Sequence, residues 1–421
     1  MPKAEHHHQR RLYPVPKGQT HGGDARHHAR WRAVNTVFCF GGKMEYWDPD
    51  MFNDFERLAS FDVLMKAHKR ARRGKRHTPG TAHFEANLLN SIEKLSYILL
   101  NKKYKPSRFE VFTVYEPKQR MVQAPAHVDK VVQHALVDFY LYDILTASLI
   151  RDNYAVQIGR GTHDGLNRIK HHMRSYFRKR KGRDEIERQA DGLPHRPMDE
   201  WDYAQGWVLK ADIKQFFHSI NHDIVKGMLR ERVPDQRVLE LMYTYIDVSE
   251  GLPLGYQTSQ LLALMYLDPF DHWVKEKLGI KYYGRYMDDF YLIHEDKRYL
   301  KRCLREIEDY MTSLGLTLNE KTEITPLRNG IDFLGFRLYL TETGKVVQKL
   351  RQSSAKRMKR RIKSWVKDQE NGKADLKHIW DSYTAWNAHA AYGHTRELRI
   401  KIKRQMTANF KDIRKSKGSA Q

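Results

Sequence analysis

The sequence is short of cysteine and of long apolar runs. Only two cysteines, Cys39 and Cys303, occur among 421 residues, which excludes a disulfide framework or a cysteine metal site of paired spacing. No stretch approaches the ~20 consecutive apolar residues of a membrane-spanning helix. The first residues, MPKAEHHHQRR, are basic but no apolar segment follows them, which argues against a secretory signal. We therefore expect a cytoplasmic protein with no membrane partner.

Negative charge is scarce relative to positive charge. Lys and Arg total 75 against 51 Asp and Glu, a net charge of +24, while 40% of the residues are hydrophobic. The apolar content is enough for a core. The basic excess favours a polyanionic partner, above all nucleic acid. On charge alone, a merely soluble basic protein is the alternative.

The chain length and local patterns predict several structural units of mixed helix and strand. We expect an N-terminal extension over residues 1–50 that is partly flexible. The expected helices lie in 51–104, 127–147, 222–247, 257–276 and 297–313, with further basic helices from Lys349 onward. The expected strands are FEVFTVYE and RMVQA around a Pro117–Arg120 turn, WVLKAD, the hairpin KYYGRYMDDFYLIHE and the pair in GIDFLGFRLYL. The charged segment at about 178–205 is predicted to be an inserted loop.

Two adjacent carboxylates, Asp288 and Asp289, lie between apolar runs in Tyr286-Met287-Asp288-Asp289-Phe290. Along a strand these side chains would face opposite ways, whereas a tight turn lets both lie near a hairpin tip. Adjacent carboxylates repel each other unless a cation neutralises them. Mg²⁺ prefers oxygen ligands and keeps positions open for substrate phosphates. A bare pair of aspartates is usually an exposed turn, but the apolar flanks favour a metal site.

A third carboxylate, Asp212, ends the predicted strand WVLKAD. A strand-end acid that faces a carboxylate pair is the layout of a two-metal site, in which the metals activate a 3′-hydroxyl and stabilise the leaving pyrophosphate. Taken alone, Asp212 is more simply a helix N-cap. The combination of the three acids indicates a two-metal site much more specifically than any one of them does.

The ordered set of motifs resembles the reverse transcriptase family. VLKADIKQFF is similar to its first palm motif, PLGYQTSQ to its second and YMDDF to its catalytic hairpin, while LTLNEKTEI and IDFLGFRLY are similar to the two motifs that follow. The resemblance covers about residues 55–410. It implies an α+β right-hand polymerase fold with fingers (51–207), a palm with an antiparallel sheet (208–343) and a basic α-helical thumb (344–421). The implied activity is RNA-directed DNA polymerisation.

The resemblance also implies roles for individual acids. Asp212 and Asp288 would bind two Mg²⁺ ions, with Mn²⁺ as a substitute. Asp289 would assist, and the Ile213 carbonyl would be a further metal ligand. Lys321 occupies the position of a proton donor to pyrophosphate, although a plain surface lysine is the alternative.

The predicted nucleotide contacts come from several motifs. Phe217 matches the steric gate that rejects ribose 2′-hydroxyls. Lys118 and Arg120 match residues that clamp the triphosphate, the alternative being an ordinary basic hairpin tip. Gly255 is expected to let the nucleotide approach the backbone closely. The loop around Arg160 is a candidate for binding template phosphates, and it is no P-loop because it lacks the Gly-Lys-Ser/Thr ending.

The segment from Leu254 to Gln260 helps to place the chain within the family. Intron and retroviral relatives usually read Gln-Gly and end in Ser-Pro, whereas this segment is LGYQTSQ. It resembles the diversity-generating retroelement branch, in which an aliphatic residue at this position accompanies error-prone copying at template adenines. Leu254 and Gln260 are therefore predicted nucleotide contacts, with core packing as the alternative for Leu254.

The basic C-terminal region is predicted to hold nucleic acid through phosphate contacts that do not read sequence. Its candidate residues are Lys356, Arg360, Arg361 and Lys363. A solvated helix face is the alternative. The expected partners are template RNA, the DNA primer and product, dNTPs, a cognate structured non-coding RNA and a basic accessory protein.

Two other functions remain open from the sequence. One is an antiviral defence reverse transcriptase that uses a non-coding RNA, which would suit the N-terminal extension and the long segment at 178–205. The other is a catalytically silent RNA-binding scaffold. The presence of Asp212, Asp288 and Asp289 argues against a silent scaffold, which needs none of these costly acids.

Overall fold

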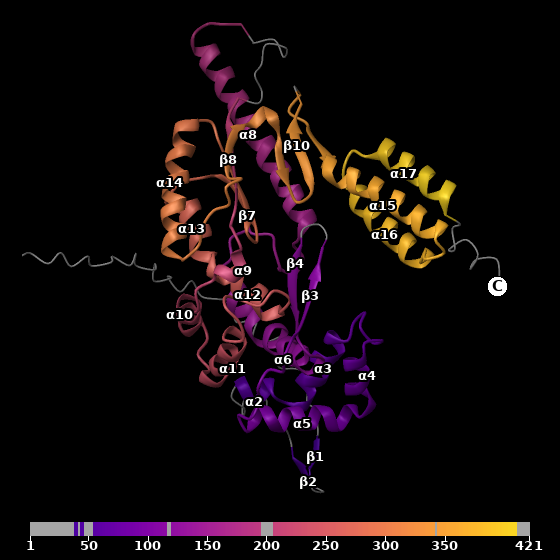
Figure 1. Ribbon diagram of the computed structural model, residues 1–421. Helices are drawn as coiled ribbons and strands as arrows, with labels where there is room; N and C mark the ends of the chain where they lie inside the picture. Colours follow the sequence, from indigo (N-terminus) through magenta and orange to yellow (C-terminus); the bar gives the residue numbers. More distant parts are fainter. Residues whose placement is uncertain are drawn as a thin grey trace, which may run out of the picture. The chain divides into compact units, whose positions relative to one another are not determined.

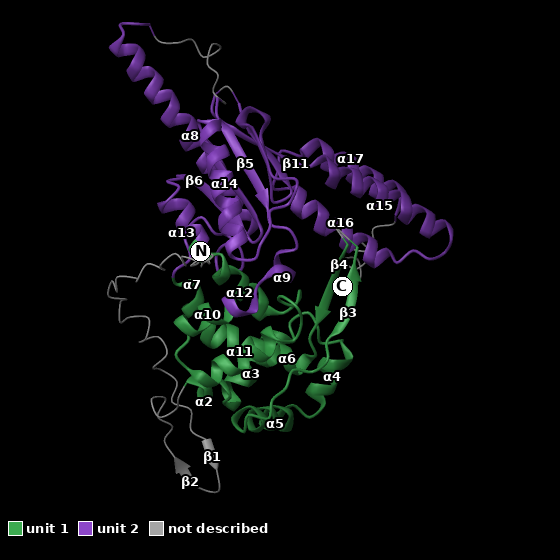
Figure 2. Ribbon diagram, turned by 60° about the vertical axis from the view of Figure 1, so that its left-hand side comes forward, with its two compact units in different colours: residues 1–147, 225–269 green, residues 148–224, 270–421 purple. Residues whose placement is uncertain are grey.

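The computed structural model describes residues 54–115, 119–194, 205–341 and 343–410, together with the two short strands β1 (Phe38–Phe40) and β2 (Lys43–Glu45). Its contacts divide the chain into unit 1, residues 1–147 with 225–269, and unit 2, residues 148–224 with 270–421 (Figure 2). Apart from β1 and β2, the predicted N-terminal extension lies outside the described residues, as does Lys118.

Unit 1 is mainly helical. Its helices are α2 (Asp54–Leu58), α3 (Phe61–Ala71), α4 (Pro79–Ala86), α5 (Leu88–Leu100), α6 (His127–Leu136), the π-helix η2 (Val137–Leu141), α7 (Tyr142–Thr146), α11 (Gln236–Ile246) and α12 (Gln257–Tyr266). Helices α10 (His222–Arg232) and α13 (Asp268–Glu276) each run from one unit into the other. The predicted helical regions 51–104 and 127–147 are confirmed.

Helix α3 packs on α5 and α6. It begins where the Ser60 side chain accepts a hydrogen bond from the Val63 amide, which satisfies one of the unpaired donors of the first turn. The apolar residues of α5 that recur at helical spacing, such as Ile92, Leu95 and Leu99, are buried. The helical pattern of the sequence is therefore the pattern of the core in this unit.

The predicted strand pair around residues 109–123 is confirmed as a two-stranded antiparallel hairpin of β3 (Glu110–Val114) and β4 (Arg120–Ala124). Most of its side chains are exposed, including those of Val111, Phe112 and Met121. The Gln123 amide donates to the Leu254 carbonyl at 2.8 Å. This bond ties β4 to the segment that precedes α12.

Unit 2 is built on a four-stranded antiparallel sheet in the order β6-β7-β5-β8. Strands β7 and β8 are labelled in Figure 1, and β5 and β6 in Figure 2. Its strands are β5 (Trp207–Asp212), β6 (Tyr282–Tyr286), β7 (Asp289–His294) and β8 (Glu323–Pro326). The hairpin predicted in KYYGRYMDDFYLIHE is thus β6 and β7. Helix α14 (Lys297–Ser313) packs on β5, β7 and β8, and it has the bounds predicted from the sequence.

A second sheet has the order β11-β10-β9, with strands β9 (Ile331–Phe333), β10 (Phe336–Leu340) and β11 (Val346–Leu350). Helix α8 (Thr162–Ala190) contacts β6 of the first sheet and β10 and β11 of the second. The residues buried among these elements form one core cluster that includes Tyr154, Met173, Phe333 and Phe336. The strand pair predicted in GIDFLGFRLYL is confirmed.

The prediction of a loop over 178–205 is wrong for its first part, because α8 continues to Ala190. Residues 178–190 are mostly polar, but the residue types that dominate the segment are Arg, Lys, Glu and Gln. These four types have good intrinsic helix propensity. Polarity alone therefore suggested a loop where helix propensity prevails. Residues 195–204 lie outside the described residues.

The C-terminal part of unit 2 contains α15 (Gln352–Glu370), α16 (Leu376–Ala390) and α17 (Arg396–Asn409). A separate core cluster joins them and includes Trp365, Trp380 and Met406. The predicted basic helices after Lys349 are confirmed, and β11 ends just before the first of them. Among the described residues, no helix has both the length and the apolar character needed to cross a membrane.

Candidate active site

The strand register of unit 2 brings the predicted acids together at one end of the first sheet. Asp212, the last residue of β5, is paired with Asp289, the first residue of β7. Asp289 is also paired with Tyr286 of β6, so Met287 and Asp288 form the hairpin tip. The Ile213 amide donates to the Asp288 carbonyl at 3.0 Å, which ties the tip to the end of β5. All three carboxylates are half-buried.

The tip has an unusual backbone conformation. Met287 has φ +55°, a left-handed conformation that costs a residue other than glycine about 1–2 kcal/mol. The guanidinium of Arg285 donates through Nη1 to the Met287 carbonyl at 2.9 Å. This hydrogen bond holds the turn in the form that places Asp288 at the tip.

Arg285 is itself held by a buried ion pair. Its Nε and Nη2 donate to the two carboxylate oxygens of Asp271 at 2.7 and 2.6 Å, and both side chains are 0% exposed. The Tyr283 hydroxyl donates to Asp271 at 2.5 Å, and the Asn153 amide donates to it at 3.2 Å. Neither Arg285 nor Asp271 was predicted from the sequence. An arginine inside an otherwise apolar strand was the available signal, because a buried charge needs a partner.

Lys210 is a further residue that was not predicted from the sequence. It lies two residues before Asp212 on β5, and its ammonium pairs with the Asp289 carboxylate. Burial lowers the pKa of Lys210 to about 7, while the charges of Asp212 and Asp288 act in the opposite direction. Near neutral pH this lysine beside Asp289 is therefore only partly protonated.

The loop that follows α14 is attached to Asp212. The Asn319 backbone amide donates to the Asp212 carbonyl at 2.7 Å, and its side-chain amide donates to Oδ2 at 3.4 Å. The Lys321 amide in turn donates to Asn319 Oδ1 at 3.1 Å, and Lys321 is exposed. Lys321 thus belongs to the same loop as the groups that orient Asp212, and its role as a proton donor stays a prediction.

The donor atoms at the hairpin tip suit a hard divalent cation. Within the described ranges, no three His, Cys, Asp or Glu side chains gather closely enough to hold a metal on their own. Mg²⁺ is commonly bound by one or two carboxylates, with waters and substrate phosphates completing its octahedral shell. Asp212 and Asp288 fit that kind of site, which the substrate completes, and Asp289 already has Lys210 as a partner.

The predicted nucleotide contacts fall in both units. In unit 2, Phe217 is half-buried in α9 (Phe216–Ser219), beside the fully packed Phe216. In unit 1, Arg120 and Gln260 are exposed and Leu254 is half-buried. Leu254 is therefore only partly enclosed by the core. The roles of these residues in nucleotide binding stay predictions.

Gly255 occupies a position that no other residue fits easily. Its φ is +122°, and a Cβ added there would lie 2.6 Å from the Gln123 carbonyl oxygen and 3.1 Å from a Val122 methyl group. The first of these contacts is short enough to force the backbone to shift. Glycine is therefore required where β4 passes the segment before α12.

The predicted phosphate-binding residues differ in how they are engaged. Arg160 donates to the carbonyls of Ile150 and Asn153, at 3.2 and 3.3 Å, so it already stabilises its own loop. On α15, Lys356, Arg360 and Lys363 are exposed, and their spacing places them on one face of the helix. Arg361 is half-buried and donates to the Ser382 hydroxyl at 3.2 Å.

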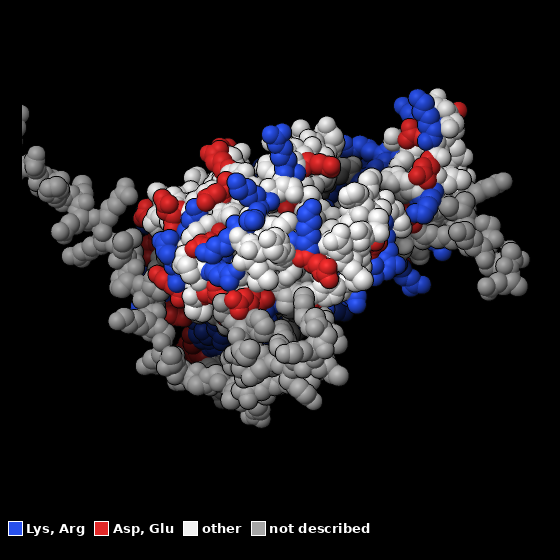
Figure 3. Space-filling model, turned by 90° about the horizontal axis from the view of Figure 1, so that it is seen from below, with Lys and Arg blue, Asp and Glu red and all other residues white. Residues whose placement is uncertain are grey.

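The net positive charge does not form one uniform surface. On the face shown in Figure 3, the Lys and Arg side chains of the described residues are interspersed with Asp and Glu. Contacts with nucleic acid must therefore be argued from particular helices, such as α15, rather than from the net charge.

Comparison with protein families gives a match over residues 105–338 to the family described as reverse transcriptase (RNA-dependent DNA polymerase). The match covers more than half of the chain, from β3 to β10. It contains Asp212, Asp288 and Asp289, together with all the predicted nucleotide contacts.

Individual relatives are distant. Protein YkfC of Escherichia coli (strain K12) is 26% identical over 319 residues, covering 62% of this chain and 76% of that protein. The putative COX1/OXI3 intron 1 protein of Saccharomyces cerevisiae is 21% identical over 208 residues, covering 33% of this chain and 24% of that protein. Among solved structures, telomerase from Candida albicans in complex with a TWJ fragment of telomeric RNA matches with a TM-score of 0.38 and 12% identity. That match covers 66% of this chain and 55% of the telomerase chain.

Proposed function

The chain belongs to the reverse transcriptase family of RNA-directed DNA polymerases, and we propose that it copies RNA into DNA by nucleotidyl transfer at a two-metal site formed by Asp212 and Asp288. The observation that carries the proposal is the register of β5 against the β6–β7 hairpin, which joins the two acids at one sheet end. The α+β fold with its antiparallel sheet is the fold expected of a right-hand polymerase.

Each residue around the acids has a proposed task. Divalent ions, Mg²⁺ or Mn²⁺, would activate the primer 3′-hydroxyl and stabilise charge on the leaving pyrophosphate. Asp212 and Asp288 would hold these ions, with Asp289 assisting and the Ile213 carbonyl as a further ligand. Arg285 fixes the turn that presents Asp288, and Asn319 orients Asp212.

The remaining steps concern the nucleotide. Lys321 would protonate the leaving pyrophosphate. Lys118 and Arg120 would neutralise the triphosphate, because a polyanion that reacts in line needs fixed cations. Phe217 would exclude the ribose 2′-hydroxyl. Gly255 would let the nucleotide approach the backbone.

We propose the fingers at 51–207, the palm at 208–343 and the thumb at 344–421. Residues 208–212 of β5 and strands β6 to β10 then belong to the palm, and α15 to α17 to the thumb. The exposed cations Lys356, Arg360 and Lys363 on one face of α15 support a thumb that holds the template–primer duplex by its phosphates. Arg160 would contact template phosphates if its loop bonds rearrange.

Primer extension on a defined RNA template, with Mg²⁺ and four dNTPs, tests the proposal. The native protein should extend the primer, and Asp288→Asn should lose about a thousandfold or more of the rate, which is about 4 kcal/mol of barrier. Asp309→Asn is the matched control, since Asp309 is exposed on α14.

Two results would count against the proposal. One is an Asp288→Asn variant that is as active as the control variant. The other is native protein that binds the RNA tightly yet makes no DNA with any divalent ion, which would favour the silent scaffold.

For the biological role, we propose error-prone cDNA synthesis in a diversity-generating retroelement. The half-buried Leu254 supports this, because an aliphatic side chain cannot orient the nucleotide by hydrogen bonding as an amide would. Sequencing the products should show errors concentrated opposite template adenine, and Leu254→Gln should reduce them. Equal error rates at all four template bases would contradict the proposal, and a product of fixed sequence made from one host RNA would favour a defence role.

The proposed partners are template RNA, a DNA primer and product, a cognate structured RNA and a basic accessory protein. Because this chain carries a net charge of +24, a basic protein would be repelled unless RNA lies between them. Copurification should therefore be abolished by ribonuclease.

A further inference from the structure

A small basic pocket lies in unit 2 between α8 and the β6–β7 hairpin. We call it the α8 pocket, and it is lined by Tyr176, Lys179, Arg180, Arg183, Gly279, Lys281, Tyr282, Ile293, His294 and Glu295. Its cavity volume is about 120 Å³. Pockets for drug-sized ligands have volumes of about 300–1,000 Å³, so this one suits a single small group.

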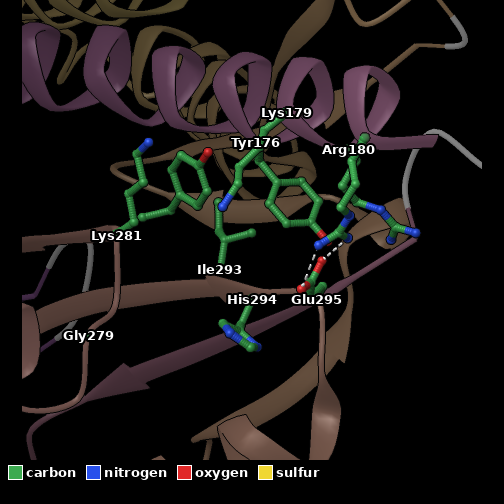
Figure 4. A pocket seen from close by; sticks show the side chains of 10 residues that line it. Tyr176, Lys179, Arg180, Gly279, Lys281, Ile293, His294 and Glu295 are labelled. Atoms are coloured by element: carbon green, nitrogen blue, oxygen red, sulfur yellow. Dashed lines mark hydrogen bonds and ion pairs between the residues drawn. The ribbon is translucent and has the colours of Figure 1, made fainter. Parts of the chain in front are cut away.

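The lining has more positive than negative charge. Four cationic side chains face one carboxylate, that of Glu295. Arg183 pairs with Glu295, which leaves the charges of Lys179, Arg180 and Lys281 in excess. Figure 4 shows Lys179 extending from α8 toward Ile293, and Lys281 extending toward α8.

Two of the excess cations, Arg180 and Lys281, are held by groups other than carboxylates. Arg180 donates to the backbone and side-chain carbonyl oxygens of Gln205, both at 2.6 Å. Lys281 has its ammonium 5.7 Å from the centre of the Tyr282 ring. Three cations around one small cavity form a site for an anion with several acceptor oxygens.

The chemistry of the lining favours phosphate over a nucleobase. The two tyrosines, Tyr176 and Tyr282, are only 4% and 7% exposed, so their ring faces are not available for stacking a base. The Tyr176 hydroxyl is also engaged, because it donates to the Gln205 carbonyl at 2.7 Å. The pocket therefore offers charge without base recognition, as contacts with a nucleic-acid backbone do.

The pocket is separate from the active site. Tyr282 and Ile293 form the first pair of the hairpin, whereas Tyr286 and Asp289 form the last pair, at the tip. Four residues of strand span about 13 Å. A group in the α8 pocket is thus too far along the hairpin to be one of the phosphates that react at Asp288.

We propose that the α8 pocket binds a backbone phosphate of the RNA, outside the template–primer end that is being copied. The proposal rests on the proposed function, since it assumes that RNA is the ligand of this protein. It gives the RNA a second anchoring point on unit 2. The occupant is a chain phosphate, because the lining has an excess of positive charge and no free aromatic face for a base.

The test compares binding of two labelled RNAs to the full chain. One is a minimal template that ends at the primer helix, and the other carries a long single-stranded extension. Lys179→Ala/Lys281→Ala should weaken binding of the extended RNA about tenfold and reduce the slope of log affinity against log salt by roughly 0.7–1.4, the effect of one or two lost phosphate contacts. Primer extension on the minimal template should be unchanged.

The matched control is Lys301→Ala/Arg305→Ala, which removes two exposed charges from α14. Equal losses of RNA affinity in the two double variants, or no loss in either, would overturn the proposal. So would competition by polyglutamate as strong as that by RNA of equal charge, since this would indicate an acidic protein segment.

The binding measurement needs no catalysis. Native protein that extends neither template would therefore contradict the proposed function, while the RNA affinities of the variants would still decide for or against the pocket.

Discussion

The β6–β7 and β3–β4 hairpins are both antiparallel pairs next to proposed site residues, but they differ in how they are supported. In β6–β7, Tyr283, Phe290 and Tyr291 are 0% exposed. In β3–β4, Phe112 is 49% exposed and Met121 is 70% exposed. One hairpin is part of a four-stranded sheet, and the other is a two-stranded sheet of its own.

This difference in packing indicates that the two hairpins have different functions. Groups that bind metal ions must be held within a fraction of an ångström, which requires packing on all sides. A hairpin with few buried contacts has a low free energy of local opening, and such elements suit a step that must admit and release a substrate. We therefore expect substitutions in β6–β7 to affect the chemical step and those near β3–β4 to affect nucleotide binding.

The largest effect is expected at Arg285. Arg285→Met leaves Asp271 buried without its partner and removes the donor to the Met287 carbonyl. Loss of one member of a buried pair costs about 3–5 kcal/mol, so the free energy of unfolding in denaturant should fall by that amount and DNA synthesis should fall with it.

A double variant separates these two effects. In Arg285→Met/Asp271→Asn no unpaired charge stays buried, and the Asn amide oxygen can still accept from the Tyr283 hydroxyl. Stability should largely return while the rate constant of the chemical step stays low, because the tip still lacks its donor. Recovery of both would show that Arg285 only stabilises the fold.

The next largest effect is expected in the choice of sugar. Phe217→Val opens space beside the proposed nucleotide, so discrimination against ribonucleotides should fall by about 10–100-fold in single-nucleotide incorporation. Tyr97→Val, at an exposed aromatic residue of α5, is the control. Unchanged discrimination in Phe217→Val would assign the gate to another residue.

A smaller effect is expected where β3–β4 is attached. Gly255→Ala forces a Cβ against the Gln123 carbonyl oxygen, and such overpacking costs about 1–3 kcal/mol. The KM for dNTPs should rise about tenfold, and the single-turnover rate at saturating dNTP should change little. Gly182→Ala is the control, since nothing lies within 4 Å of its added Cβ. A Gly255→Ala variant with an unchanged KM and a lower single-turnover rate at saturating dNTP would contradict a role of β3–β4 in nucleotide binding.

The sequence predicted the elements whose residues carry a local pattern. Apolar flanks around Asp288 and Asp289 indicated a buried hairpin, and β5 was evident because WVLKAD is an apolar run that ends in an acid. The family match confirms the kind of enzyme, while the individual site roles stay predictions.

The features that were not predicted depend on contacts between distant residues. Asp271 and Arg285 come from different elements and meet only when α13 packs beside β6. Lys210 was not recognised because a lysine in a strand usually faces solvent, and its pairing with Asp289 requires the register of β5 and β7. The end of α8 was missed because residues 178–190 show no apolar stripe.

The smallest expected effect is a pH dependence of stability that comes from α3 and α6, the second of which follows β4. His68 and His127 are buried and joined ring to ring at 3.1 Å, with Thr81 bonded to His127. Burial lowers the pKa of His127 to about 4 and also lowers that of His68. The unfolded chain therefore binds more protons between about pH 4 and 6.5.

The sign of the pH dependence follows from these lowered pKa values. The contribution of these two neutral histidines to the free energy of unfolding is fully present above about pH 6.5, and it is lost as the pH falls toward 4. The free energy of unfolding should drop by about 2 kcal/mol between pH 7 and 5, and the drop should be smaller in His127→Gln. His77→Gln, at an exposed histidine, should keep the full drop. An equal drop in both variants would place the acid sensitivity elsewhere.

The most direct test of the central claim is a double-mutant cycle on Asp212→Asn and Asp288→Asn, measured as single-turnover rate constants of primer extension. If both acids hold the same metal site, each single variant should lose about a thousandfold and the double variant should lose little more, because groups that act as one unit are strongly non-additive. Losses that multiply in the double variant would show two independent contributions and would contradict a site shared by Asp212 and Asp288.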